Sequence, residues 1–306
     1  MATQTIPPTP SALSPPVDAA VWLEARADAL GAEMQKKRPW LVLSRPPTFT
    51  RGLIIGPPIT TISKPDGSTR TTTGLLTKGP EGTITDKGVY IDCQQLWTFL
   101  SSRIDLRSKR YPPGAPGTLA KIREKIRDYL EFSRGPRRKG LHQGKIIWIR
   151  LLPSHVEVST GGRAFRFADE GSDLATFGKI LEDMTGRNTR GPHDWLLPGV
   201  VLTNDRYLPS TPESTGPTDI LPLVTVVPLV LSKPLLGPGA PRVAHPNVRS
   251  VYYAPLTQCL LTVDYLTTSS DGMQRLIVDR TGFTKWTTDD DTRRAIVDEV
   301  LGLLGM

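Results

Sequence analysis

Apolar residues recur at helical spacing in three stretches of the chain. The clearest is Thr118–Arg134, which Gly135 and Pro136 end. Its apolar positions, all on one face of a 3.6-residue period, are Leu119, Ile122, Ile126, Tyr129 and Leu130. A second helix is predicted at the end of the chain, where Asp289–Asp291 precede an apolar stripe at Ile296, Val300, Leu301 and Leu304.

The third predicted helix covers residues 15–38. Acids lie near its start, a Lys-Lys-Arg run lies at its end, and Pro39 follows it, which matches the helix dipole at both ends. Its apolar stripe is thin, so we expect a peripheral helix that lies on the surface or against a neighbouring subunit.

Elsewhere the pattern is that of short strands and turns. Residues 145–152 form an apolar run typical of a buried strand, and residues 155–167 predict a hairpin that turns at Gly161-Gly162. A hairpin is also predicted around Pro65-Asp66-Gly67, and another over 259–280, turning at Asp271-Gly272. Residues 94–100 are typical of a short apolar helix, and residues 221–231 of a Pro-interrupted edge strand.

The 29 prolines and 27 glycines among 306 residues favour many turns and short elements. We therefore predict an α+β, β-rich fold of antiparallel hairpins with a few short helices and a mobile, Pro-rich N-terminal arm. The expected parts are a disordered arm (1–14), the peripheral helix (15–38), a basic β-rich main domain (39–206), a linker (207–220), and a smaller domain of a β-hairpin and the C-terminal helix (221–306).

No recognisable catalytic or metal-binding pattern is found. Cys93 and Cys259 are too few for a disulfide scaffold, the four histidines lack zinc-ligand spacing, and residues 140–145 are one residue short of a phosphate loop. Cys93 is more typical of a buried apolar residue than of a nucleophile. We predict that the protein is not an enzyme and needs no cofactor or metal. Neither a secretory signal nor a membrane-spanning apolar run is seen, so we expect a non-secreted, cytoplasmic protein.

Positive charge is concentrated in one segment. The chain has a net charge of +8, and residues 103–150 hold 14 Lys/Arg against four acids, so the remainder is slightly acidic. If the 118–134 helix buries its apolar face, the basic residues around it form one surface that suits phosphate groups. The predicted nucleic-acid-binding residues are Arg103, Arg107, Lys109, Arg110, Lys121, Lys125, Arg134, Arg137, Arg138, Lys139, Lys145 and Arg150.

The expected partner is therefore nucleic acid, RNA or single-stranded DNA, bound with little base readout, and self-association is also expected. In general character the chain resembles structural proteins of RNA viruses, with a neutral arm, a Thr/Pro-rich β body and a single basic element. This resemblance implies a coat, nucleocapsid or matrix-type protein, and a virion as an alternative location. One departure is that the arm holds no Lys or Arg before Arg26. The alternatives are a matrix-like protein that binds anionic membrane, an enzyme without a recognisable motif, and a merely solvated or protein-facing basic patch.

Overall fold

The computed structural model of the chain describes residues 17–23, 37–45, 53–61, 76–78, 89–100, 104, 116–134, 140–150, 157–160, 163–166, 196–208, 223–229, 242–244, 251–253, 261–264, 276–277 and 287–306. Within these residues strands outnumber helices, and the paired strands run antiparallel. The predicted α+β, β-rich class, built on antiparallel pairing with few short helices, is confirmed.

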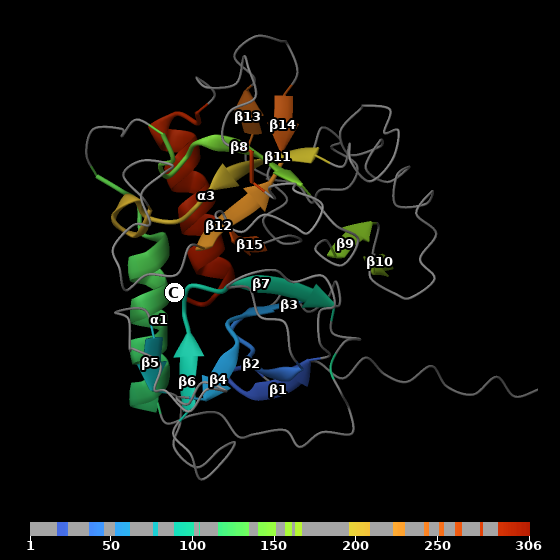
Figure 1. Cartoon of the computed structure of the whole chain (residues 1–306), viewed down its shortest axis with the longest axis vertical. Helices are drawn as coiled ribbons and strands as arrows, with labels where there is room; N and C mark the ends of the chain where they lie inside the picture. Colours follow the sequence, from blue (N-terminus) through green and yellow to red (C-terminus); the bar gives the residue numbers. More distant parts are fainter. Residues whose placement is uncertain are drawn as a thin grey trace, which may run out of the picture.

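A first group of strands precedes helix α1 (Pro116–Leu130). These strands are β1 (Ala20–Leu23), β2 (Arg38–Leu41), β3 (Leu53–Gly56), β4 (Ile59–Thr61), β5 (Leu76–Lys78), β6 (Val89–Asp92) and β7 (Trp97–Leu100). They pair as β1–β2, as β3–β7 and, in a three-stranded sheet, in the order β4-β6-β5. Figure 1 shows them gathered at one end of the molecule, with α1 along their side.

A second group of strands follows α1. These strands are β8 (Ile146–Arg150), β9 (Glu157–Thr160), β10 (Arg163–Arg166), β11 (Leu196–Val201), β12 (Leu223–Pro228), β13 (Arg242–Ala244), β14 (Val251–Tyr253), β15 (Leu261–Asp264) and β16 (Leu276–Ile277). Five of them form a sheet in the order β15-β12-β11-β8-β16, and β9–β10 and β13–β14 form separate pairs. A 3-10 turn, η5 (Asp205–Tyr207), follows β11, and helix α3 (Asp290–Leu303) lies beside the sheet (Figure 1).

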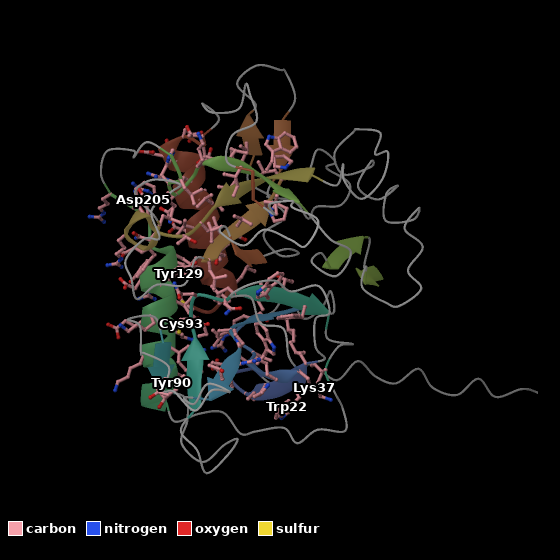
Figure 2. All side chains as sticks on the ribbon, viewed as in Figure 1. Trp22, Lys37, Tyr90, Cys93, Tyr129 and Asp205 are labelled. Carbon is pink, nitrogen blue, oxygen red and sulfur yellow. The ribbon has the colours of Figure 1, made fainter. Side chains whose placement is uncertain are left out.

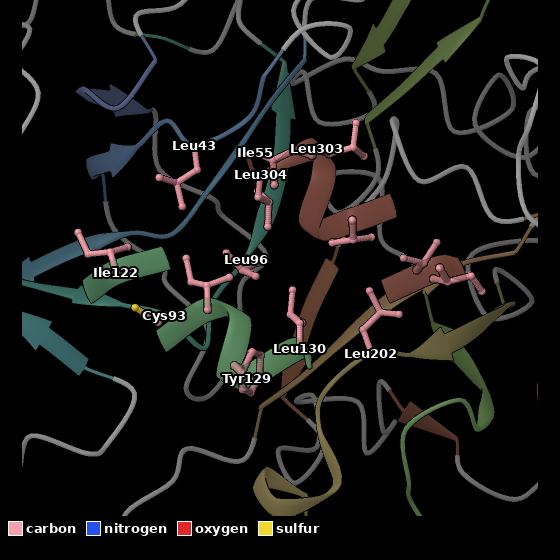
Figure 3. Close-up of a cluster of buried hydrophobic side chains, with 14 of the residues drawn as sticks. Leu43, Ile55, Cys93, Leu96, Ile122, Tyr129, Leu130, Leu202, Leu303 and Leu304 are labelled. Carbon is pink, nitrogen blue, oxygen red and sulfur yellow. The ribbon is translucent and has the colours of Figure 1, made fainter. Parts of the chain in front are cut away.

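The two groups of strands share one hydrophobic core. Leu96 of the first group, Ile126 of α1, Val227 of the five-stranded sheet and Ile296 of α3 are all completely buried in the same cluster. Figure 3 shows side chains from both groups and from both helices meeting in this cluster. The backbone also joins the groups, because the N–H of Arg45, just after β2, donates to the carbonyl of Leu303 at 2.9 Å.

Both strongly patterned helices were predicted correctly in place, although α1 ends at Leu130 rather than at Arg134. The side chain of Asp289 caps α3 by accepting hydrogen bonds from the N–H and the hydroxyl of Thr292. Those bonds, the backbone one above all, lower the pKa of Asp289 because they stabilise its ionised form.

Replacing Asp289 with Ala is expected to reduce the free energy of unfolding by about 1 kcal/mol at neutral pH, because the cap is lost. The carboxylate stabilises the fold above its ordinary, unfolded-state pKa, and its contribution disappears as the pH falls through the lower folded-state pKa. Urea unfolding should therefore show that the free energy of unfolding differs less between the unchanged protein and Asp289→Ala at pH 3 than at pH 7. Asp289→Asn, which caps without titrating, should keep most of the stability at pH 7.

The predicted peripheral helix over 15–38 is wrong, because its two described ends are strands. β1 and β2 pair in antiparallel register, with Val21 opposite Trp40 and Trp22 opposite Pro39. Val21 and Leu23 are buried whereas Trp22 between them is partly exposed, which is the period-2 pattern of a strand. Of the charged residues that suggested a helix dipole, Glu24 and Lys36 lie outside the described residues, whereas Asp18, Lys37 and Arg38 lie within them.

Three other predictions of local structure are also wrong. Residues 97–100 are a strand rather than a helix, since β7 pairs with β3. β12 is central rather than an edge strand, because it pairs with β11 on one side and with β15 on the other. β15 and β16 do not form a hairpin but lie at opposite edges of the five-stranded sheet.

The buried strand at 146–150 and the β9–β10 hairpin are confirmed. The arm (1–14) and the turn at Pro65-Asp66-Gly67 lie outside the described residues, as does nearly all of the predicted linker. β11 and β12, on either side of that linker, pair with each other. The division of the chain there stays a prediction, and the described strands on its two sides belong to one sheet.

Gly56, at the end of β3, allows two strands to approach closely. A Cβ added there would overlap the carbonyl oxygen of Leu41 in β2, whereas a Cβ added at Gly302 in α3 would meet nothing within 4 Å. We expect Gly56→Ala to lower the free energy of unfolding by about 3 kcal/mol or more, because backbone must move. Gly302→Ala should raise it by about 0.5–1 kcal/mol through helix propensity, and chemical denaturation of both variants tests the pair of expectations.

Candidate functional site

The residues predicted to bind nucleic acid are only partly within the described structure. Seven lie outside it: Arg103, Arg107, Lys109, Arg110, Arg137, Arg138 and Lys139. Lys121 and Arg134 are exposed and Lys125 is half-buried, and these three lie on α1 or just after it. The backbone of Arg150 ends strand β8. Lys145 was expected at the surface but is buried, with 5% exposure, and its backbone forms an isolated antiparallel β-bridge with Thr287.

The charged face of α1 carries acids as well as bases. Glu124 and Glu131 are exposed, and Asp128 forms an ion pair with Arg206. Asp128 also accepts a hydrogen bond from the hydroxyl of Tyr207, whose pKa is raised mainly by burial. A polyanion surface over residues 103–150 therefore stays a prediction, and the described part of it has mixed charge.

The segment that resembles a shortened phosphate loop is a structural junction. The side-chain amide of Gln143 donates to the carbonyls of Leu130, Glu131 and Leu202, at 3.0, 3.2 and 2.7 Å, and so closes the end of α1. Gly144 has φ 83°, and Arg293 of α3 donates to the carbonyl of Gln143 at 3.1 Å. These groups bind one another, and this accounts for the polar residues of the loop without a ligand.

Cys93 and its neighbours form a buried turn between β6 and β7. Cys93 is completely buried, and burial raises the pKa of its thiol far above the usual range, with Asp92 adding to the effect. Asp92 accepts hydrogen bonds from the N–H of Gln94 at 3.1 Å and from the side-chain amide of Gln95 at 3.0 Å. The thiol is therefore protonated and unsuited to nucleophilic attack, and the carboxylate is engaged in holding the turn.

A second charged cluster joins the elements of the first group. Asp18, in a left-handed conformation with φ 61°, accepts from Arg123 of α1 and, at 3.4 Å, from Arg45. The N–H of Asp18 also donates to the carbonyl of Val42 at 2.7 Å. Asp18 therefore has a structural role, because its contacts connect the start of β1, the segment after β2, and α1.

A different arrangement is found where β2 and β4 meet. A guanidinium N–H of Arg38 donates to the hydroxyl oxygen of Thr60 at 3.0 Å. This contact joins two side chains that are 22 residues apart, and its partners are not backbone groups. Arg38 is partly exposed and Thr60 is 5% exposed, so the pair lies at the edge of the packed interior.

The strands position this pair for reasons that are visible in the sequence. Arg38 begins β2, and the bridge between Trp40 and Pro58 brings β2 beside the start of β4. Along β4, Ile59 belongs to the hydrophobic core, so the next residue, Thr60, points to the opposite face of its sheet. The same alternation that buries Ile59 therefore places the Thr60 hydroxyl on the Arg38 side.

A guanidinium beside a hydroxyl has a defined chemical capacity. Arginine presents a planar set of N–H donors that match the oxygens of a phosphate group, and it stays charged at every physiological pH. A threonine hydroxyl both donates and accepts a hydrogen bond. Close to a buried surface these interactions are stronger than in water. The Arg38–Thr60 pair is therefore suited to binding a phosphate and to stabilising charge that develops on it.

The sequence analysis missed both residues. Arg38 was assigned to the end of a helix, and Thr60 belongs to the stretch predicted as a hairpin around Pro65-Asp66-Gly67. Neither lies in the basic segment, and nothing in a single sequence pairs two positions in separate strands.

The segment that contains this pair matches a known protein family. Residues 19–130 match the model of the PemK-like, MazF-like toxins of type II toxin-antitoxin systems. The match begins directly before β1 and ends with the last residue of α1. It covers just over a third of the chain, and no curated protein matches the chain.

Solved structures of such toxins also align with part of the chain. A MazF from Deinococcus radiodurans is 24% identical with a TM-score of 0.30, and the alignment covers 38% of this chain and 94% of that one. A mycobacterial endoribonuclease in complex with its cognate antitoxin is 16% identical, with a TM-score of 0.28 and coverages of 37% and 92%. The Mycobacterium tuberculosis toxin MazF-mt6 is 17% identical, with a TM-score of 0.25 and coverages of 35% and 93%.

The family match corrects the functional expectations drawn from the sequence. A coat, nucleocapsid or matrix-type protein of a virus, or a matrix-like membrane-binding protein, is contradicted because the matched family consists of toxins. The expectation that the protein is not an enzyme is contradicted by the same finding. A nucleic-acid partner and self-association remain in keeping with it, whereas an antitoxin is a kind of partner that the sequence analysis did not predict. In the described parts of the chain, no helix is long and apolar enough to cross a membrane.

Proposed function

We propose that the chain is an RNA-cleaving enzyme of the toxin type, with Arg38 and Thr60 at its reactive centre. The observation that supports this proposal best is the 3.0 Å contact between these two side chains, inside the segment that matches the toxin family. The endoribonuclease named among the similar structures supports RNA as the substrate. A toxin that cleaves RNA would act in the cytoplasm, where the sequence analysis places the protein.

The proposed reaction uses the 2′-hydroxyl of RNA as the nucleophile. The 2′-oxygen forms a bond to the adjacent phosphorus, and the bond from phosphorus to the 5′-oxygen breaks. The proton lost by the 2′-oxygen is matched by the proton gained by the 5′-oxygen, and the products are a 2′,3′-cyclic phosphate and a 5′-hydroxyl. DNA lacks the 2′-hydroxyl and is not cleaved by this route.

Arg38 and Thr60 would have complementary roles in this step. The Arg38 guanidinium donates to the non-bridging phosphate oxygens, whose negative charge increases as the 2′-oxygen attacks. The Thr60 hydroxyl, held by Arg38, hydrogen-bonds to the reacting group and fixes it relative to the guanidinium. The exposed Lys121 and Arg134 and the half-buried Lys125 would contact the RNA backbone farther from the cleaved bond, together with the predicted basic residues outside the described structure.

The proposal is tested by incubating the purified chain with a long single-stranded RNA of mixed sequence. We expect fragments that end in a 2′,3′-cyclic phosphate, identified by mass spectrometry. An oligonucleotide that covers a mapped cleavage position, and carries a 2′-O-methyl group there, should stay intact. Equal cleavage of the methylated oligonucleotide, or intact RNA at every protein concentration, would contradict the proposed function.

A further inference from the structure

The residue directly opposite Thr60 on the neighbouring strand is an aromatic one. In the antiparallel pair β4–β6, Thr60 lies in register with Tyr90, and Ile59 with Ile91. Directly opposed residues of an antiparallel pair point to the same face, with their Cβ atoms about 5 Å apart. Tyr90 therefore lies on the same face as the Thr60 hydroxyl, which Arg38 contacts. Figure 2 labels Tyr90 on β6.

The two faces of the β4–β6 pair differ in the exposure of their side chains. Ile59 and Ile91 are 3% and 0% exposed and belong to the hydrophobic core. Tyr90 is partly exposed, although it lies in the same strand as two buried neighbours, Ile91 and Asp92. A tyrosine that was needed for the core would be on the isoleucine face. Its ring is instead partly accessible on the face of the Arg38–Thr60 pair.

Other aromatic residues near β2 do not share this position. Trp22 is partly exposed, but it is in register with Pro39, and consecutive residues of a strand point to opposite faces, so it lies away from Arg38. Trp40, Trp97 and Phe99 are all at most 5% exposed and pack against one another. Among the described residues of these strands, Tyr90 is the aromatic side chain placed to meet a ligand of the pair.

We propose that Tyr90 stacks against the base next to the phosphate that Arg38 and Thr60 hold. This inference rests on the proposed function, because it assigns a second contact to the same substrate. A phenol ring offers a flat apolar surface for any of the four bases, and base–aromatic stacking is a common source of affinity for unpaired nucleic acid. A nucleotide fixed at both its phosphate and its base cannot rotate away, so stacking would also position the 2′-oxygen for attack.

The experiment compares Tyr90→Phe and Tyr90→Leu with the unchanged protein on an RNA that contains 2-aminopurine beside a mapped cleavage position. Stacking quenches the fluorescence of 2-aminopurine. We expect quenching with the unchanged protein and with Tyr90→Phe, and its loss with Tyr90→Leu. The KM of Tyr90→Leu should rise about tenfold, in the range expected for the loss of one stacked base. Trp22→Leu is the matched control, and its KM and quenching should stay unchanged.

Binding of a 2′-O-methyl copy of the same RNA separates this inference from the proposed function. If RNA is cleaved but Tyr90→Leu binds and quenches like the unchanged protein, the Tyr90 assignment is wrong and the proposed function stands. If the methylated copy is bound with quenching that depends on Tyr90, while no RNA is cleaved, the stacking assignment stands and the proposed function is wrong. Circular dichroism and thermal unfolding confirm that Tyr90→Leu is folded before either comparison.

Discussion

Thr60→Val is expected to reduce RNA cleavage at least about a hundredfold and to leave the fold unchanged, in line with the loss of one preorganised polar group at a reactive centre. Valine keeps the shape of threonine, and Thr60 is 5% exposed, so the packing of β4 against its neighbours is retained. What is lost is the oxygen that accepts from Arg38 at 3.0 Å. The effect should appear mainly in kcat, because the hydroxyl acts on the reacting group.

Substitutions of Arg38, together with a conservative change at Thr60, test the same expectation. Arg38→Ala should lose as much activity as Thr60→Val, and Arg38→Lys should recover little of it, since an ammonium group cannot reproduce the planar donors of a guanidinium. Thr60→Ser keeps the hydroxyl and should retain most of the activity. Arg127→Ala removes an exposed arginine of α1 and serves as the control for loss of positive charge. Cleavage by Thr60→Val and Arg38→Ala at the unchanged rate would remove this pair from the reactive centre.

The two helices could be predicted from the sequence because their signals are local. Tyr129 and Leu130 continue the apolar stripe of α1, and Asp289 supplies the cap of α3 through a bond to a residue three positions later. Such signals do not depend on what the rest of the chain does. The β9–β10 hairpin was predictable for the same reason, since only Gly161 and Gly162 separate its two strands in the sequence.

The remaining strand pairings could not be read from local patterns. Val21 pairs with Trp40, 19 residues away, and Ile54 pairs with Phe99 although β4, β5 and β6 lie between them in the chain. The charged residues between β1 and β2 imitate a helix dipole, and the apolar run of residues 94–100 has no period that distinguishes a strand from a helix. In both places the pairing partner, which is distant in sequence, decided the structure.

The candidate site could not be predicted for the same reason, because it depends on pairing between strands. Arg38 and Thr60 meet only because β2 lies beside β4, and Tyr90 joins them only through the β4–β6 register. Each is unremarkable in sequence, whereas the basic segment is conspicuous in composition alone. A cluster of charge is visible in one sequence, but a site built from single residues of three strands becomes visible only when the pairing is known.

A chain that ends at residue 134 is expected not to fold, although it contains the entire segment that matches the toxin family. Leu96 and Ile126 of that segment pack in one cluster with Val227, Ile296 and Leu304 from the later part of the chain, and all of them are completely buried. Each large apolar side chain that returns to water costs about 1.5–3 kcal/mol, and exposing several of them exceeds the usual stability of 5–15 kcal/mol.

Single substitutions in α3 and the residue after it test the same dependence without truncation. Leu304 is completely buried, so Leu304→Ala should lower the free energy of unfolding by about 2–5 kcal/mol. Leu301 is half-buried at the edge of the cluster, and Leu301→Ala should cost clearly less. Urea denaturation measures both variants, and sedimentation and circular dichroism report on the truncated chain. A cooperative, monomeric fold of residues 1–134 would show that the toxin-like segment is an independent domain, whereas the shared core requires the two parts to fold together.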